Sequence, residues 1–158
     1  ITSSVRRPSP DVLDPKIHHC NLIQSILAKI EANHAGADDA LMLDSRGFVA
    51  ETNATHLFIV DDGLVVTSRL VACPEGITRE VVLGLCRDND IPHEVRDLSL
   101  TEVYRAGEMF CTGTMGELAP VIQVDGRTIG DGEIGPVTRR LAKFFDTCVA
   151  AEAEPVLD

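Results

Sequence analysis

Four short apolar segments with tight turns between them occupy the stretch from residue 40 to residue 67. The turn sequences DSRG and DDG interrupt this stretch. Short segments rich in Val, Ile, Leu and Phe and bounded by Asp and Gly are typical of β-strands. We therefore expect an antiparallel meander with strands at residues 40–43, 48–51, 56–60 and 64–67.

Helical periodicity appears on both sides of these strands. Asn21 is placed to cap a first helix over residues 21–35, and Gly36 follows its last turn. The sequence after Gly76 predicts a second helix over residues 77–89, and the tail from Pro136 to about residue 153 predicts a third. The apolar positions of the first helix are Leu22, Ile23, Ile26, Leu27 and Ile30.

The remaining signals complete a mixed pattern. Ser99 and Glu102 have the spacing of a capping box at the start of a short helix, and Asp125-Gly126 is a hairpin turn sequence. Residues 93–96 and 109–113 predict further strands. With 158 residues and 44% hydrophobic content, the chain predicts one domain over residues 1–158. The predicted fold class is mixed α/β (α+β) with a mainly antiparallel sheet.

The charge balance excludes some partners. The formal net charge is −11, with 25 acidic residues against 14 Lys and Arg. Nucleic acids and anionic membranes are bound through basic faces, which this composition does not favour. We expect neither as a partner.

The cysteines and the termini bear on the compartment. The cysteines are odd in number, widely spaced and without a CxxC pair, which predicts reduced thiols and no metal site. No apolar run approaches the roughly 18 residues of a membrane span, and the start is not that of a signal peptide. We expect a cytoplasmic protein. Because the chain lacks an initiator Met and opens within a predicted strand, we expect a fragment of a longer protein. The cysteines are Cys20, Cys73, Cys86, Cys111 and Cys148.

Three stretches place polar groups at the mouth of a regular element. In GITR, residues 76–79, the backbone N–H groups of a helix start and the Thr78 hydroxyl suit an anion. In TGTMGEL, residues 112–118, backbone amides near Thr114 could form a nest for phosphate or carboxylate. Glu51 ends a strand where a buried carboxylate would need a cation or a protonated ring nitrogen. Taken singly, a glycine junction, a glycine turn and a solvated charge also explain them.

The ordered set of motifs resembles the class IV aminotransferases, which are pyridoxal-phosphate enzymes of fold type IV. This family includes branched-chain aminotransferases, D-amino acid aminotransferases and aminodeoxychorismate lyases. The resemblance runs from the first strand to GPVTRRL and includes GADDALMLDSRGFVAETNATHLFIVDDGLVVT, GITREVV, EMFCTGTMGELAPV and DGRTIGDGEIGPVT. It implies the large C-terminal domain of such an enzyme, with a mainly antiparallel sheet or pseudo-barrel flanked by helices. It also implies a smaller N-terminal domain that this chain lacks, so that the isolated chain would be weakly active or inactive.

The resemblance implies roles for several residues toward pyridoxal 5′-phosphate. Glu51 would pair with the pyridine nitrogen. Ile77, Thr78 and Thr114 would hold the phosphate, and the amides around Thr114 and Met115 would receive the substrate carboxylate. Leu22 stands where branched-chain enzymes have a tyrosine, which departs from a strict branched-chain pattern.

The catalytic lysine is the weakest match in the stretch DPKIHHCN. The family lysine forms the Schiff base with the cofactor and stands three or four residues before the helix-opening asparagine, here Asn21. Lys16 stands five residues before it, and His18 occupies the usual lysine position. The catalytic assignment is Lys16, brought into register by a bulge or a longer loop. The alternative is a chain that lacks this chemistry.

The implied activity is pyridoxal-phosphate-dependent transfer of an amino group between an amino acid, with branched-chain amino acids among the candidates, and a 2-oxo acid. The small-molecule partners would be these two substrates, and the enzyme would be a homodimer. The alternatives are an elimination of the aminodeoxychorismate lyase type and a non-catalytic relative without the Schiff-base lysine.

Overall fold

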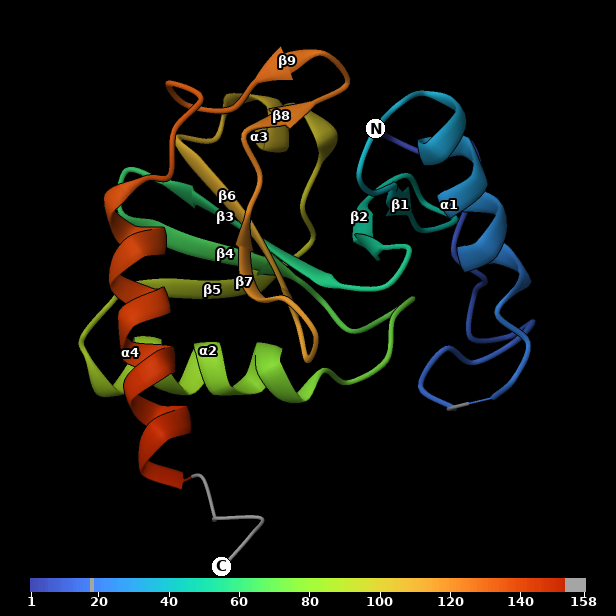
Figure 1. Ribbon diagram of the computed structural model, residues 1–158. Helices are drawn as coiled ribbons and strands as arrows, with labels where there is room; N and C mark the ends of the chain where they lie inside the picture. Colours follow the sequence, from blue (N-terminus) through green and yellow to red (C-terminus); the bar gives the residue numbers. More distant parts are fainter. Residues whose placement is uncertain (18, 153–158) are drawn as a thin grey trace, which may run out of the picture.

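The computed structural model describes residues 1–17 and 19–152, and its centre is a five-stranded sheet (Figure 1). The strand order is β5-β4-β3-β6-β7, with every neighbouring pair antiparallel except the parallel pair β4 and β5. This arrangement confirms the mixed α/β class with a mainly antiparallel sheet. The strands are β3 (His56–Asp61), β4 (Leu64–Ser68), β5 (His93–Arg96), β6 (Glu108–Gly113) and β7 (Glu117–Pro120).

The expected four-stranded meander is wrong, because the chain leaves the first strand pair before it enters the central sheet. Strands β1 (Leu41–Leu43) and β2 (Val49–Thr52) form a separate antiparallel ribbon, and β3 pairs with β4 and β6 instead of β2. The turn after β2 is closed locally. The N–H of Thr52 donates to the Thr55 carbonyl at 2.8 Å, and the Thr52 hydroxyl accepts from the Thr55 N–H at 2.9 Å.

The two faces of the central sheet carry separate cores because side chains alternate along each strand. Phe58 and Phe110 stack at 5.0 Å between ring centroids on the face covered by α2 (Ile77–Asp88) and α4 (Pro136–Glu152). Leu57 and Ile59 lie on the other face, against the β1–β2 ribbon, α3 (Leu100–Arg105) and the hairpin of β8 (Gln123–Val124) and β9 (Arg127–Thr128). The fold is therefore layered around one sheet.

Local signals predicted the remaining elements with one omission. The capping box of Ser99 and Glu102 is present, and Asp125 and Gly126 have positive φ angles of 51° and 74° in the β8–β9 hairpin. These confirm the predicted helix start and turn. The sequence does not predict strand β7, which is defined by its pairing with β6. No helix within the described ranges combines the length and apolar character needed to cross a membrane.

Helix α1 (Ile23–His34) turns its large apolar side chains outward. Its N-cap is Leu22 with no side-chain hydrogen bond, so the prediction that Asn21 caps the helix is wrong. Gly36 follows the helix with the expected positive φ of 69°. The buried residues of the helix are Ala28 and Ala32. The predicted apolar positions instead form an aliphatic stripe that is 43–55% exposed, consisting of Leu22, Ile23, Ile26, Leu27 and Ile30.

A buried carboxylate from the central sheet caps helix α4. The backbone N–H groups of Val137 and Thr138 donate to Glu108 at 3.0 and 2.7 Å, and the Thr138 hydroxyl donates to it at 2.7 Å. These N–H groups have no partner within the helix, and the anion also faces the positive end of the helix dipole. Gly135 is required beside them, because a Cβ there would overlap the Glu108 side chain.

We predict that Glu108→Ala lowers the free energy of unfolding by about 2–4 kcal/mol, because buried donors at the start of α4 lose their acceptor. Urea denaturation followed by circular dichroism measures the change. The control is Glu133→Ala, which alters an exposed carboxylate close to the same helix start. Equal effects of the two substitutions would contradict this account of the cap.

Candidate active site

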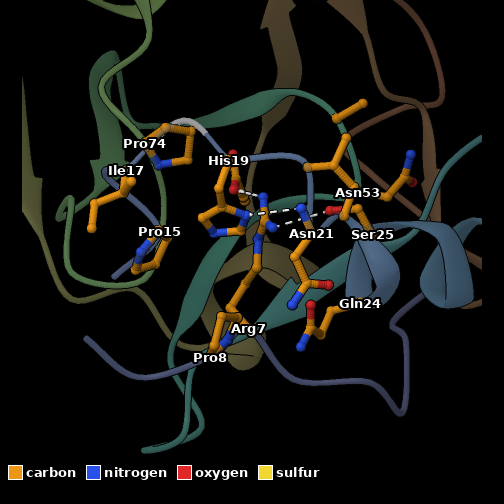
Figure 2. Close-up of a pocket in the computed structure, with 13 residues that line it drawn as sticks. Arg7, Pro8, Pro15, Ile17, His19, Asn21, Gln24, Ser25, Asn53 and Pro74 are labelled. Atoms are coloured by element: carbon orange, nitrogen blue, oxygen red, sulfur yellow. Dashed lines mark hydrogen bonds and ion pairs between the residues drawn. The ribbon is translucent and has the colours of Figure 1, made fainter. Parts of the chain in front are cut away.

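A cavity of about 240 Å³ lies where the N-terminal segment, the start of α1 and the end of β2 meet (Figure 2). Its walls combine a charged pair with apolar and amide groups. Proline and isoleucine side chains close one side, and the polar residues of α1 and of the turn after β2 lie on the other. The lining residues are Arg7, Pro8, Pro15, Ile17, His19, Asn21, Leu22, Gln24, Ser25, Glu51, Asn53, Ala54 and Pro74.

Glu51 supplies the carboxylate of this cavity and is only 3% exposed. It lies in β2 opposite Met42 of β1, so the ribbon fixes its backbone. Its Oε1 forms an ion pair with Nη2 of Arg7. Its Oε2 lies 3.9 Å from Nδ1 of His56, which is too far for a hydrogen bond.

Arg7 is held on three sides. Its backbone N–H donates to the carbonyl of Leu43 in β1 at 2.9 Å, and its Nη1 donates to the hydroxyl of Ser25 in α1 at 3.1 Å. The ion pair to Glu51 supplies the third contact, and Figure 2 shows both side-chain contacts of Arg7 as dashed lines. Burial lowers the pKa of the Arg7 guanidinium, and the charge of a Cys73 thiolate would act in the opposite direction.

His56 connects the cavity with two other parts of the predicted site. It opens β3, where its register partner is Thr112 of β6, and its ring lies so close to Gly76 that a Cβ there would overlap it. Burial is the main cause that lowers the pKa of His56 to about 4, and the charges of Arg79 and Arg7 lower it further. The ring is therefore neutral at neutral pH.

The start of α2 is open to a ligand. Gly76 is the N-cap and no side chain accepts from the first N–H groups of the helix. Ile77 is 84% exposed and Thr78 is partly exposed. A helix start of this kind, with free N–H groups and a positive dipole end, favours an anion.

The predicted site residues are only partly brought together. Glu51 lines the cavity, whereas Ile77, Thr78, Thr114 and Met115 do not. Thr114 and Met115 are exposed in the turn between β6 and β7. His56 nevertheless lies next to all three regions, because it is near Glu51 of β2, pairs with the end of β6 and contacts the start of α2.

Lys16 is exposed and is not among the residues that line the cavity. Its backbone N–H donates to Oδ1 of Asp14 at 3.0 Å. Burial raises the pKa of the Cys73 thiol to about 11, and the positive charge of Lys16 acts in the opposite direction. His18 lies outside the described residues. His19 lines the cavity, and its Nδ1 accepts from the N–H of Asn21 at 3.2 Å.

Sequence reasoning missed Arg7 and Ser25. An alternation in the first residues could have indicated Arg7, because Ser3 and Arg7 face inward whereas Ser4 and Arg6 are exposed. Within residues 1–17 and 19–152, no three His, Cys, Asp or Glu residues are grouped so as to hold a metal ion. Chemically, the site can accept a protonated nitrogen at Glu51 and an anion at the start of α2.

Comparisons with known proteins place this arrangement among relatives. Residues 1–124 match the family model described as "Amino-transferase class IV". The chain is 49% identical over 156 residues to "Branched-chain-amino-acid aminotransferase-like protein 2" of Arabidopsis thaliana, covering 99% of this chain and 28% of that protein. It is 42% identical over 146 residues to the "Putative branched-chain-amino-acid aminotransferase" of Methanocaldococcus jannaschii, covering 92% of this chain and 51% of that protein.

The fold matches a solved structure of a "Branched-Chain Amino Acid Aminotransferase with Pyridoxamine 5'-phosphate", from an organism abbreviated T.th.. The TM-score is 0.92 and the sequence identity is 39%, with 95% of this chain and 50% of that chain covered. This chain therefore spans between about a quarter and about half of the length of these relatives.

We predict that Gly76→Ala destabilises the protein by about 1–3 kcal/mol, because the new methyl group overlaps the His56 ring and forces it to move. Chemical denaturation measures the loss. The matched control is Gly84→Ala within the same helix, where the new methyl group would meet only the flexible end of Arg87, at 3.7 Å. That substitution should raise stability by up to about 1 kcal/mol. A loss at both positions would assign the effect to the helix and not to His56.

We predict that His56 makes the protein lose stability as the pH falls. The folded-state pKa of about 4 lies below the ordinary value of 6.5, so the unfolded chain takes up the proton first. The stability from the neutral ring is complete above about pH 6.5 and falls by up to about 3 kcal/mol toward pH 4. Denaturation curves of wild type and His56→Asn at several pH values measure it, and parallel pH profiles would contradict it.

Proposed function

The chain belongs to the class IV aminotransferase family, and on that premise we propose that the protein uses pyridoxal 5′-phosphate to transfer an amino group between an amino acid and a 2-oxo acid. The observation that carries the proposal is the buried carboxylate of Glu51 in the cavity wall. A buried carboxylate at this place can pair with a protonated ring nitrogen, because water does not compete for the contact there. The branched-chain relatives make branched-chain amino acids the first substrates to test.

The residues present fit the cofactor in two respects. Glu51 offers an acceptor for the ring nitrogen, and the uncapped start of α2 offers N–H donors for a phosphate. The bare backbone of Gly76 lets the His56 ring pack against this helix start. When bound, the cofactor supplies an electron sink for the bonds around the substrate Cα.

We assign the phosphate contacts to the amides of Ile77 and Thr78, with the Thr78 hydroxyl and Thr114 as further donors. The amides around Thr114 and Met115 would receive the substrate carboxylate. The exposure of Ile77, Thr114 and Met115 supports an open binding surface on this side. These groups orient the ligand and carry out no proton transfer in this scheme.

Lys16 is the proposed site of covalent attachment and the carrier of the proton at the substrate Cα. Its exposed position means that the backbone around Lys16 must change conformation for its amine to enter the cavity.

The assembly is part of the proposal. Residues 1–158 would form the larger, cofactor-binding domain of a homodimer in the cytoplasm, with a smaller N-terminal domain in the full-length protein. The aliphatic stripe of α1 supports a further protein surface against this domain, because contiguous exposed apolar patches mark interaction sites. The length of the relatives supports additional chain.

One observation favours a second candidate function. No lysine of the described residues lines the cavity, so the domain could bind the cofactor without covalent attachment, as a non-catalytic relative would. The two candidates differ in whether a lysine can be trapped.

We predict that the full-length protein with pyridoxal 5′-phosphate gives an absorbance band near about 410–430 nm, and that borohydride then fixes the cofactor on Lys16. Mass spectrometry of the digested protein locates the adduct. Lys16→Ala should abolish it, whereas the control Lys29→Ala, which alters an amine on α1, should leave it. Binding without any trapped adduct would support the non-catalytic candidate, and an adduct on another peptide would refute the assignment of Lys16.

A further inference from the structure

We propose that Arg7 is a positioning residue that acts through Glu51, keeping the buried carboxylate ionised and leaving Oε2 as the acceptor for a ligand nitrogen. The ligand in this statement rests on the proposed function, whereas the effect of Arg7 on Glu51 does not. The inference starts from the contacts of the two side chains in the cavity wall (Figure 2).

Glu51 cannot remain an anion at this depth without a cation. A carboxylate taken out of water pays a desolvation cost of several kcal/mol, and an unpaired one takes up a proton instead. At 3% exposure, Glu51 has little access to water. Its ionisation therefore depends on the charges that surround it.

Among the described residues, Arg7 is the only side chain in contact with Glu51 that is positively charged at neutral pH. His56 of β3 lies 3.9 Å from Oε2 and is neutral at neutral pH. Arg79 of α2 directs its Nη2 to the carbonyl of Ser68 at 3.0 Å. The remaining titratable groups nearby are the neutral thiol of Cys73, the exposed Lys16 and His19 in the cavity wall.

Arg7 is also fixed in place, as a positioning residue must be. The backbone bond to Leu43 and the side-chain bond to Ser25 hold it between β1 and α1. These contacts do not depend on Glu51. The guanidinium is therefore held where it meets Oε1, and the His56 ring lies 3.9 Å from Oε2, too far for a hydrogen bond.

A ligand nitrogen and Arg7 would then share one carboxylate. Arg7 keeps the acceptor ready before the ligand arrives, so a ligand that carries a ring proton binds without releasing it. With a neutral residue in place of Arg7, Glu51 would hold its own proton. Either this proton or the proton on the ligand ring nitrogen would then have to leave when the ligand binds. The signature of Arg7 is therefore in the pH dependence and not only in the affinity.

The first test needs no ligand. Arg7→Met should lower the melting temperature more at pH 8 than at pH 5, because the native state of this variant binds a proton on Glu51 that is lost as the pH rises. The control is Arg6→Met, which removes an exposed charge from the neighbouring position and should show no such dependence. The comparison is made with thermal unfolding at matched ionic strength.

The same substitution is then made in Glu51→Gln, as a double-mutant cycle. In that background the pH dependence of the effect of Arg7→Met should be smaller, because the substituted amide cannot ionise and only the contribution of His56 is left. Loss of the Arg7 charge also lets His56 accept a proton more readily. A pH dependence that is undiminished in the Glu51→Gln background therefore belongs to His56 and overturns the proposal. If Arg7→Met fails to fold while the double variant folds, the result supports Arg7 as the counter-ion.

The second test uses pyridoxamine 5′-phosphate, which cannot be attached to a lysine. Fluorescence titration of the full-length protein should show that the dissociation constant of Arg7→Met rises relative to wild type as the pH falls, approaching tenfold per pH unit. A constant ratio at all pH values would overturn the positioning role toward the ligand. If wild type itself does not bind, the proposed function fails, and the ligand-free cycle still decides whether Arg7 controls Glu51.

Discussion

The close contact between the His56 ring and the bare backbone of Gly76 fixes the relative position of the parts around the cavity. One neighbour of His56 is the carboxylate in β2, another is Thr112 at the end of β6, and the third is the start of α2. A side chain at Gly76 would separate the helix start from the sheet. The spacing between Glu51 and the start of α2, the two groups proposed to hold the cofactor, therefore depends on one ring and one missing methyl group.

Two buried carboxylates in strands are satisfied by groups from distant parts of the chain. Glu108 accepts from the first turn of α4, and Glu51 pairs with Arg7 of the N-terminal segment. Both contacts offset the cost of removing a charge from water, but they differ in completeness. Glu108 has donors on both oxygens, whereas Glu51 keeps one oxygen without a hydrogen bond from the described residues. The first arrangement suits a structural joint and the second suits a binding site.

The sequence predicts those elements whose signals are local. The capping box at Ser99, the turn at Asp125-Gly126 and the helix after Gly76 were all found within a few residues of their signals. Strand β7 was missed because its pairing with β6 is tertiary, and the meander was wrong because pairing of β3 with β6 is not encoded nearby. In the site, Glu51 was recognisable by motif. Arg7 was not recognisable, because its pairing with Glu51 depends on the backbone contact that holds Arg7 beside β1.

The cap on α4 also bears on the order in which the chain can fold. Its acceptor lies 29 and 30 residues before the N–H groups that it satisfies, and it belongs to the central part of the sheet. The helix start gains its partner only after β6 has been placed, so the last helix depends on contacts made across a long loop. Closing such loops costs entropy before any contact repays it, and this slows folding in chains with distant pairings. As long as α4 is still inside the ribosome, the sheet face that carries Phe58 and Phe110 therefore lacks one of the two helices that cover it.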